Sequence, residues 1–141
     1  MINDGLNLNG KLAIALNGEV VQEVNNIVVT AGKGYVASRM KDATATAMSH
    51  MAIGSGTTNP AASDTALETE LGRVALTSTA VSSNVVTYTA TFAAGTGTGA
   101  VTEAGILNAS SSGTLLCRTE FSVVNKGSSD SMTITWTVTV S

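Results

Sequence analysis

Residues 132–140 alternate strictly between apolar side chains and threonines. The apolar positions are Met132, Ile134, Trp136, Val138 and Val140, and threonine fills each position between them. A period of two puts each residue type on its own face of an extended strand, whereas a helix would mix them around its surface. The segment therefore predicts a central strand with one buried apolar face, which carries the sole tryptophan, and one hydroxyl-bearing face.

The same alternation recurs along the chain. Val86, Tyr88, Ala90 and Phe92 alternate with three further threonines, a residue type that makes up about one residue in seven. Less regular apolar segments lie at 11–16, 20–30, 51–53, 73–81, 100–107 and 114–124, and polar turn residues separate most of them. Asn17-Gly18 between the first two favours a two-residue hairpin turn. Many short strands with polar turns are typical of a β-sandwich or a small barrel.

These patterns predict one all-β domain. We expect an antiparallel β-sandwich of jelly-roll or immunoglobulin-like topology over residues 10–141, preceded by an N-terminal contact arm over residues 1–9. One or two short helices are expected, at 32–40 and at 65–71. In the second, Thr65 and Glu68 have the spacing of a capping box. A chain of 141 residues is long enough for one core but not for two.

Charge and hydrophobicity exclude several classes of function. Only 12% of the residues are charged and 43% are hydrophobic, which argues against disorder. The net charge of -3 leaves no basic surplus to neutralise phosphates, so we expect no nucleic-acid partner. No apolar run reaches the length of a membrane span, and the first residues do not resemble a secretion signal, so no membrane partner is expected.

Few residues could carry chemistry, and we expect no enzyme, no metal and no cofactor. His50 is the only imidazole, and Ser49 beside it should face the other way on a strand. Glu68 and Glu70 should point apart on a short helix, and the glycines at 95–99 lack the lysine of a phosphate loop. The low aromatic content of 4% does not favour a carbohydrate-binding module, and a glycan hydrolase is the weakest alternative.

Four other residues of interest lie on predicted strands, and three of them interrupt the strand pattern. Cys117 lies on an alternating apolar strand and is expected to be a buried structural thiol. Arg73, Arg118 and Glu120 are charged residues in otherwise apolar or hydroxyl-rich strands. They are expected to pair within the fold or to be exposed, with pairing across subunits as the alternative.

Three sequence blocks resemble a group of small structural proteins of tailed bacteriophages. The first runs from Gly10-Lys11-Leu12 through Asn26-Ile27-Val28-Val29-Thr30-Ala31-Gly32-Lys33 to Val36-Ala37-Ser38-Arg39-Met40. The second is Met51-Ala52-Ile53-Gly54-Ser55-Gly56-Thr57-Thr58, followed by Asp64-Thr65-Ala66-Leu67 and Glu70-Leu71-Gly72-Arg73. The third is Thr102-Glu103-Ala104-Gly105-Ile106-Leu107-Asn108, followed by Gly113-Thr114-Leu115-Leu116 and by residues 126–140.

The resemblance implies a virion structural protein, made in the cytoplasm of the host bacterium. A surface poor in charge and rich in small and hydroxyl side chains also suits an assembly protein, because it is less costly to desolvate. We expect a capsid decoration or cement protein that binds the major capsid protein as a homo-oligomer, and the oligomer that we expect is a trimer. The alternative is a tail-fibre, baseplate or receptor-binding component that contacts tail proteins.

Two polar segments are the candidate assembly contacts. Both are expected to be flexible and dispensable for the core, and so free to become ordered on a partner. The candidates are Ile2, Asn3, Asp4, Leu6 and Leu8 in the arm, and Thr57, Thr58, Asn59 and Pro60 in the loop at 54–64.

Overall fold

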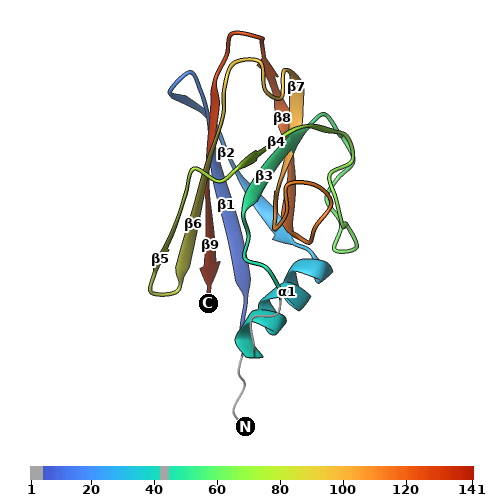
Figure 1. Cartoon of the computed structure of the whole chain (residues 1–141), viewed down its shortest axis with the longest axis vertical. Coiled ribbons are helices and arrows are strands. Elements are labelled where there is room, and N and C mark those ends of the chain that lie inside the picture. Colours follow the sequence, from blue (N-terminus) through green and yellow to red (C-terminus); the bar gives the residue numbers. More distant parts are fainter. Residues whose placement is uncertain (1–4, 42–44) are drawn as a thin grey trace.

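The computed structural model describes residues 5–41 and 45–141, and this part of the chain contains nine strands and one helix. The strands are β1 (Leu8–Leu16), β2 (Glu19–Val28), β3 (His50–Gly54), β4 (Glu70–Ala75), β5 (Ser78–Ser82), β6 (Val85–Phe92), β7 (Gly99–Leu107), β8 (Leu115–Lys126) and β9 (Met132–Val140). The helix, α1 (Thr30–Lys41), lies between β2 and β3 in the sequence (Figure 1). The prediction of an all-β fold is confirmed.

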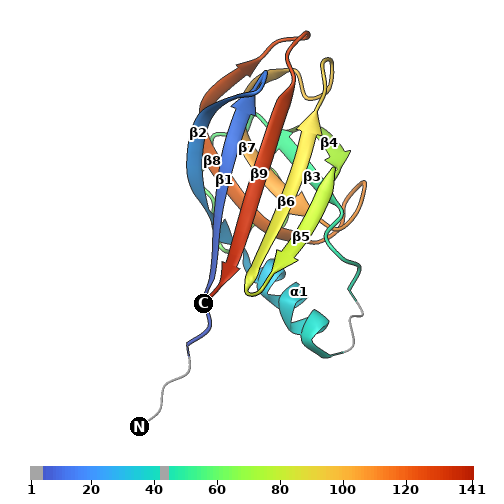
Figure 2. The same cartoon turned by 90° about the vertical axis from the view of Figure 1, so that its left-hand side faces the viewer.

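The strands form one antiparallel sheet in the order β4-β3-β7-β8-β2-β1-β9-β6-β5. The sheet curls into a half-barrel, so that the half containing β1, β9, β6 and β5 faces the half containing β8, β7, β3 and β4 (Figures 1 and 2). β2 joins the halves, because it pairs with β1 along most of its length and with β8 only at Ile27 and Val28. A two-sheet sandwich of jelly-roll or immunoglobulin-like topology is not confirmed, since hydrogen bonds connect all nine strands.

The segment at 73–81, predicted as a single strand, is divided between the two edges of the sheet. β4 ends at Ala75, and the chain then crosses to the opposite edge, where β5 begins. The main-chain N–H of Leu76 donates to the carbonyl of Ser49 beside β3, and that of Thr77 donates to the carbonyl of Thr89 on β6. Two consecutive residues therefore tie the two halves of the curled sheet together.

The core lies inside the curl, where the alternating strands point their apolar residues. On β9, Met132, Ile134 and Trp136 are fully buried, and the Trp136 indole N–H donates to Asn26 Oδ1 at 2.7 Å. β9 pairs with β1 on one side and with β6 on the other. The predicted inward face of the 132–140 strand is confirmed, and the strand lies in the interior of the sheet.

The β1–β2 hairpin turns at the predicted dipeptide. Asn17 and Gly18 have φ angles of 51° and 85°, and positive φ at both central residues defines a type I′ turn. This turn matches the right-handed twist of the two strands that it connects. The Asn17 side chain also donates to Asp130 Oδ1 at 2.9 Å, so the hairpin is attached to the β8–β9 turn.

One of the two predicted helices is present. The helix expected at 32–40 is α1, whose one buried residue, Gly32, lies so close to β8 that a Cβ there would overlap the Leu116 carbonyl. The helix predicted at 65–71 is wrong, because residues 65–69 form an irregular loop and β4 begins at Glu70. The N–H groups that a helix would leave for a capping side chain are instead bound by a distant carboxylate, described below.

The N-terminal boundary also differs from the prediction. Leu8 and Asn9 belong to β1, where they pair with Val140 and Thr139, so this end of the predicted arm is part of the sheet. The pairing continues to Asn7, which exchanges two main-chain hydrogen bonds with Ser141. Within the described residues, no helix has the length and apolar character needed to cross a membrane.

Candidate functional site

The most elaborate polar site in the described residues surrounds the carboxylate of Glu103 on β7. This side chain is fully buried. Its Oε2 accepts main-chain N–H groups of Gly56 and Thr69, each at 2.7 Å, and its Oε1 accepts that of Glu68 at 2.9 Å. Because a buried carboxylate is costly unless it is paired and hydrogen-bonded, these donors are what allow it to remain inside.

Arg118 on β8 supplies the opposite charge. It is 2% exposed, and its guanidinium donates to Glu103 Oε1 at 3.0 Å. The other nitrogens of the group reach Asp64 Oδ2 at 3.0 Å and the Thr58 carbonyl at 3.1 Å. We call Glu103, Arg118 and Asp64 the clamp, because together they hold both ends and the middle of the loop at residues 55–69.

Local backbone geometry brings the loop against the clamp. The register between β7 and β8 shifts between Val101 and Glu103, and this irregularity lets two consecutive side chains reach the loop. The Thr102 hydroxyl donates to the Gly56 carbonyl at 2.7 Å. Glycine is needed at position 56, since a Cβ there would overlap Glu103 Oε2, and at Gly54, where it would overlap the Thr69 carbonyl.

The clamped loop covers the outer face of one half of the sheet. Leu67 packs in a small second core with Val29, Ala52, Leu107 and Leu115. β7 is consequently buried on both faces over most of its length. This half of the barrel has no free outer face beneath the loop.

The loop is more constrained than its polar composition predicts. Glu68 Oε1 accepts the main-chain N–H groups of Thr57 at 2.9 Å and Thr58 at 3.4 Å. Hydrogen bonds from Thr58 and Thr57 hold the pKa of the exposed Glu68 carboxyl below its usual range. The prediction that this segment is free to become ordered on a partner is therefore wrong for its backbone.

Four candidate contact residues lie in the clamped loop just before its turn at residues 61–64, and we call these four residues the loop tip. The side chains of Thr57, Thr58 and Asn59 are exposed, and Pro60 is half-buried. None of the four is charged. The loop thus presents four uncharged residues, next to the exposed carboxylate of Glu68, on a backbone that the clamp fixes in place.

The arm candidates lie elsewhere. Ile2, Asn3 and Asp4 are outside the described residues. Leu6 is 67% exposed and Leu8 is half-buried against the core. Both line a groove beside α1, and no residue of the loop tip lines that groove. The structure does not bring the described arm residues and the loop tip into one site.

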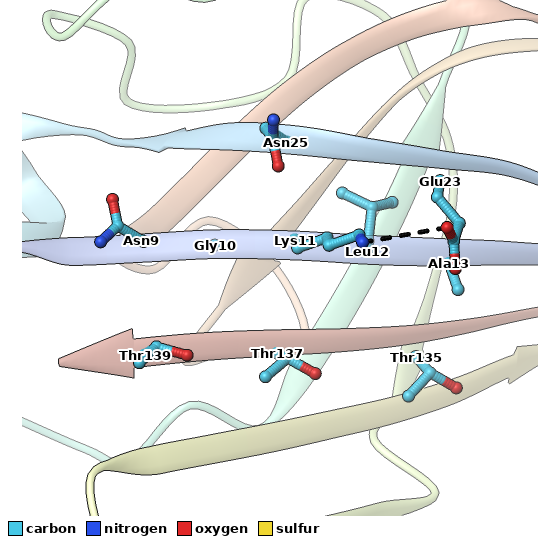
Figure 3. A pocket seen from close by; sticks show the side chains of 10 residues that line it. All are labelled: Asn9, Gly10, Lys11, Leu12, Ala13, Glu23, Asn25, Thr135, Thr137 and Thr139. Carbon is cyan, nitrogen blue, oxygen red and sulfur yellow. Dashed lines mark ion pairs between the residues drawn. The ribbon is translucent and has the colours of Figure 1, made fainter. Parts of the chain in front are cut away.

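The outer face of the half that contains β1, β9, β6 and β5 is not covered by a loop, and it is rich in hydroxyl groups. A shallow hollow of about 410 Å³ lies on this face. Figure 3 shows Thr135, Thr137 and Thr139 of β9 along one side of it. Lys11 of β1 and Glu23 of β2 form an ion pair across it at 3.8 Å, and both side chains are more than half exposed. We call this surface of β1, β9 and β6 the hydroxyl face.

The remaining residues singled out in the sequence are His50, Cys117, Arg73 and Arg118. The Ser49 hydroxyl lies 2.8 Å from His50 Nδ1, so the two do meet despite being adjacent, but no hydrogen bond joins His50 to a carboxylate in the described part of the chain. Cys117 is fully buried, and burial raises the pKa of its thiol. Arg73 pairs with Glu70, and Arg118 with Glu103 and Asp64, which confirms pairing within the fold for both arginines.

Glu103 is the residue that sequence reasoning missed. A signal for it exists, because Glu103 interrupts an apolar strand as Arg118 does, and the two strands are neighbours in the sheet. Over residues 5–41 and 45–141, no three histidine, cysteine, aspartate or glutamate side chains are grouped so that they could hold a metal ion. Comparison of the chain with protein-family models, curated proteins and solved structures found no match.

Proposed function

We propose that the chain is a virion structural protein of a tailed bacteriophage, a decoration or cement protein that binds the major capsid protein on the assembled head. The observation that carries this proposal is the clamped loop, in which the buried Glu103 and Arg118 fix an exposed tip of four uncharged residues. The sequence resemblance to small phage structural proteins supports the same assignment. The alternative is a tail-fibre, baseplate or receptor-binding component, and the experiment below distinguishes it from the decoration protein.

A fixed loop suits binding to a preformed lattice. Association costs free energy for every flexible segment that becomes ordered, so a loop already held in its bound shape loses less. The tip residues offer hydroxyl and amide groups, which are less costly to desolvate than lysine or glutamate side chains, and the neighbouring Glu68 carboxylate already accepts two main-chain N–H groups of the tip. Many weak copies bound to one shell then stabilise it by mass action, because they bind the assembled state in preference to free subunits.

The hydroxyl face supports the multi-copy part of the proposal. Apart from the exposed Lys11–Glu23 pair it presents mainly threonines, so copies can approach it with little charge repulsion. The homotrimer at a local three-fold axis stays our proposal for the arrangement on the shell. An interface of biological size should bury more than about 1,000 Å² in total.

The test compares phage particles made with and without this chain. Particles that lack it should release DNA at a lower temperature or after chelation, and adding purified protein should restore stability. Binding is then measured with Asn59→Arg, which puts bulk and charge on the loop tip. Ser128→Arg, in the exposed β8–β9 turn, adds the same side chain away from the tip and is the matched control.

The expected result is that Asn59→Arg abolishes binding to empty heads and Ser128→Arg does not. Unchanged head stability without the chain, or recovery of the chain with purified tails, would refute the cement assignment and favour the tail alternative. Equal binding by both arginine variants would refute the role of the loop tip alone.

A further inference from the structure

The two edges of the curled sheet are protected very differently. A sheet edge carries unpaired main-chain N–H and C=O groups, and proteins usually block it with charges, bulges or covering segments. On the β4 edge, Arg73 and Glu70 form an ion pair at 2.7 Å, and the pairing of β4 with β3 is irregular at Gly54. The β4 edge is therefore poorly suited to strand addition.

The β5 edge has none of these protections. β5 pairs with β6 and stands at the end of the strand order. All five of its residues are exposed, and Val81 is 74% exposed. β5 and β6 contain no charged residue and no proline. An uncharged, exposed edge of this kind is a template for pairing with another strand.

The sequence of β5 is nearly symmetric about its middle residue. In an antiparallel pair of two copies centred on Ala80, Ser78 of one copy lies opposite Ser82 of the other. Thr79 then lies opposite Val81, two β-branched side chains of almost the same shape. Ala80 lies opposite itself. A two-fold contact requires such self-complementarity, whereas a foreign strand does not.

We propose that β5 pairs antiparallel with β5 of a second copy of this chain, around a two-fold axis that passes beside Ala80. The contact extends the nine-stranded sheet of one copy into that of the next. It does not depend on the proposed phage function. On its own the β5 contact gives a dimer of two chains. If the chains also form trimers, the contact joins two trimers into a hexamer, so the number of copies is even in both cases.

In the proposed β5–β5 register, the side chains of the second copy continue the character of each face of the sheet. Thr79 and Val81 lie on the same face as their β6 partners Tyr88 and Val86, which belong to the core or pack against it. Pairing would bring the exposed Val81 of each copy against Thr79 of the other. Ser78, Ala80 and Ser82 would continue the hydroxyl face across the axis.

A cysteine at the axis gives a direct test. In directly opposed antiparallel residues the Cα atoms are about 4.5–5.5 Å apart, within the range that a disulfide requires. Ala80→Cys should therefore form a disulfide-linked dimer under mild oxidation. Ser78→Cys is the matched control, because its two copies would be roughly 13 Å apart along the strands. Cys117 is fully buried and does not compete.

The expected result is rapid cross-linking of Ala80→Cys and none of Ser78→Cys at the same protein concentration. Equal cross-linking of the two variants, or none of either, would overturn the proposed register and axis. Because the cysteine variants leave the proposed role on phage heads untouched, this result is separate from that of the head-binding experiment.

Mass measurement tests the contact without a covalent bond. Light scattering should give the wild-type protein an even number of copies, and Val81→Lys should halve its mass by placing two like charges close together, one on each side of the axis. Val123→Lys on β8 makes the same change at another exposed valine, at 52% exposure, and should leave the mass unchanged. A wild-type monomer or trimer, or the same mass for both lysine variants, would refute the two-fold contact.

Discussion

Replacing Glu103 by glutamine should destabilise the protein far more than removing one surface charge. If the glutamine oxygen keeps the N–H groups of Gly56 and Thr69, its NH₂ group must occupy the site of Oε1. There it faces two donors, the main-chain N–H of Glu68 and the guanidinium of Arg118. Each buried donor without an acceptor costs about 1–3 kcal/mol, and breaking a buried ion pair costs about 3–5 kcal/mol. We expect a loss of about 3–5 kcal/mol.

The assay is denaturant unfolding of the wild type and of Glu103→Gln, with amide hydrogen exchange to locate the effect. Exchange should accelerate first at Glu68, whose N–H loses its acceptor, and then at Thr69, whose N–H is bound by the other end of the same altered side chain. Glu23→Gln is the matched control, since the same change there removes an exposed ion pair with Lys11, worth about 0–1 kcal/mol. A loss below about 1 kcal/mol for Glu103→Gln, with unchanged exchange at both amides, would refute the clamp as the anchor of the loop.

Three further predictions follow from single contacts. Trp136→Ala should cost about 3–5 kcal/mol in denaturant unfolding, because it empties a fully buried site, and a loss under about 1 kcal/mol would contradict the inward assignment. Gly32→Ala should destabilise the fold, since its Cβ would overlap a β8 carbonyl, whereas Gly34→Ala on the same helix meets nothing within 4 Å and should stabilise by about 0.4–1 kcal/mol. Because the pKa of Glu68 is lowered in the folded protein, its ionised carboxylate stabilises the fold fully above its unfolded-state pKa, and this stabilisation is lost as the pH falls through its folded-state pKa. Acid unfolding should therefore begin at higher pH in the wild type than in Glu68→Gln, once the lower stability of that variant at neutral pH is taken into account.

The strands could be predicted because their signals are local. Alternation over five or more residues fixes which face is buried, and Trp136 on β9 lies where the pattern puts it. The hairpin at Asn17-Gly18 depends on the φ angles that two adjacent residues can adopt. In both cases the information lies within a few consecutive residues.

The loop could not be predicted because its partners are distant in the sequence. Thr65 and Glu68 have the spacing of a helix cap, yet the main-chain N–H of Glu68 is bound by Glu103, 35 residues away. Tertiary contacts of this kind override a local preference for helix. The same contacts explain why a polar, glycine-containing segment is held in one conformation. The available signal was Glu103, a charged residue inside an apolar strand. Its partner Arg118 became identifiable only once the strand order was known.

The clamp lies only partly within the sequence blocks that resemble small phage structural proteins. Those blocks contain Gly54, Gly56, Asp64 and Glu103, which help to bring the loop against the sheet, whereas Arg118 lies outside them. Residues 59–63, which follow the exposed threonines of the tip, fall between the matching segments, and so does all of β5. The block residues named here position the loop, whereas the surfaces that we propose for contact with capsid or with a second copy lie largely outside the blocks.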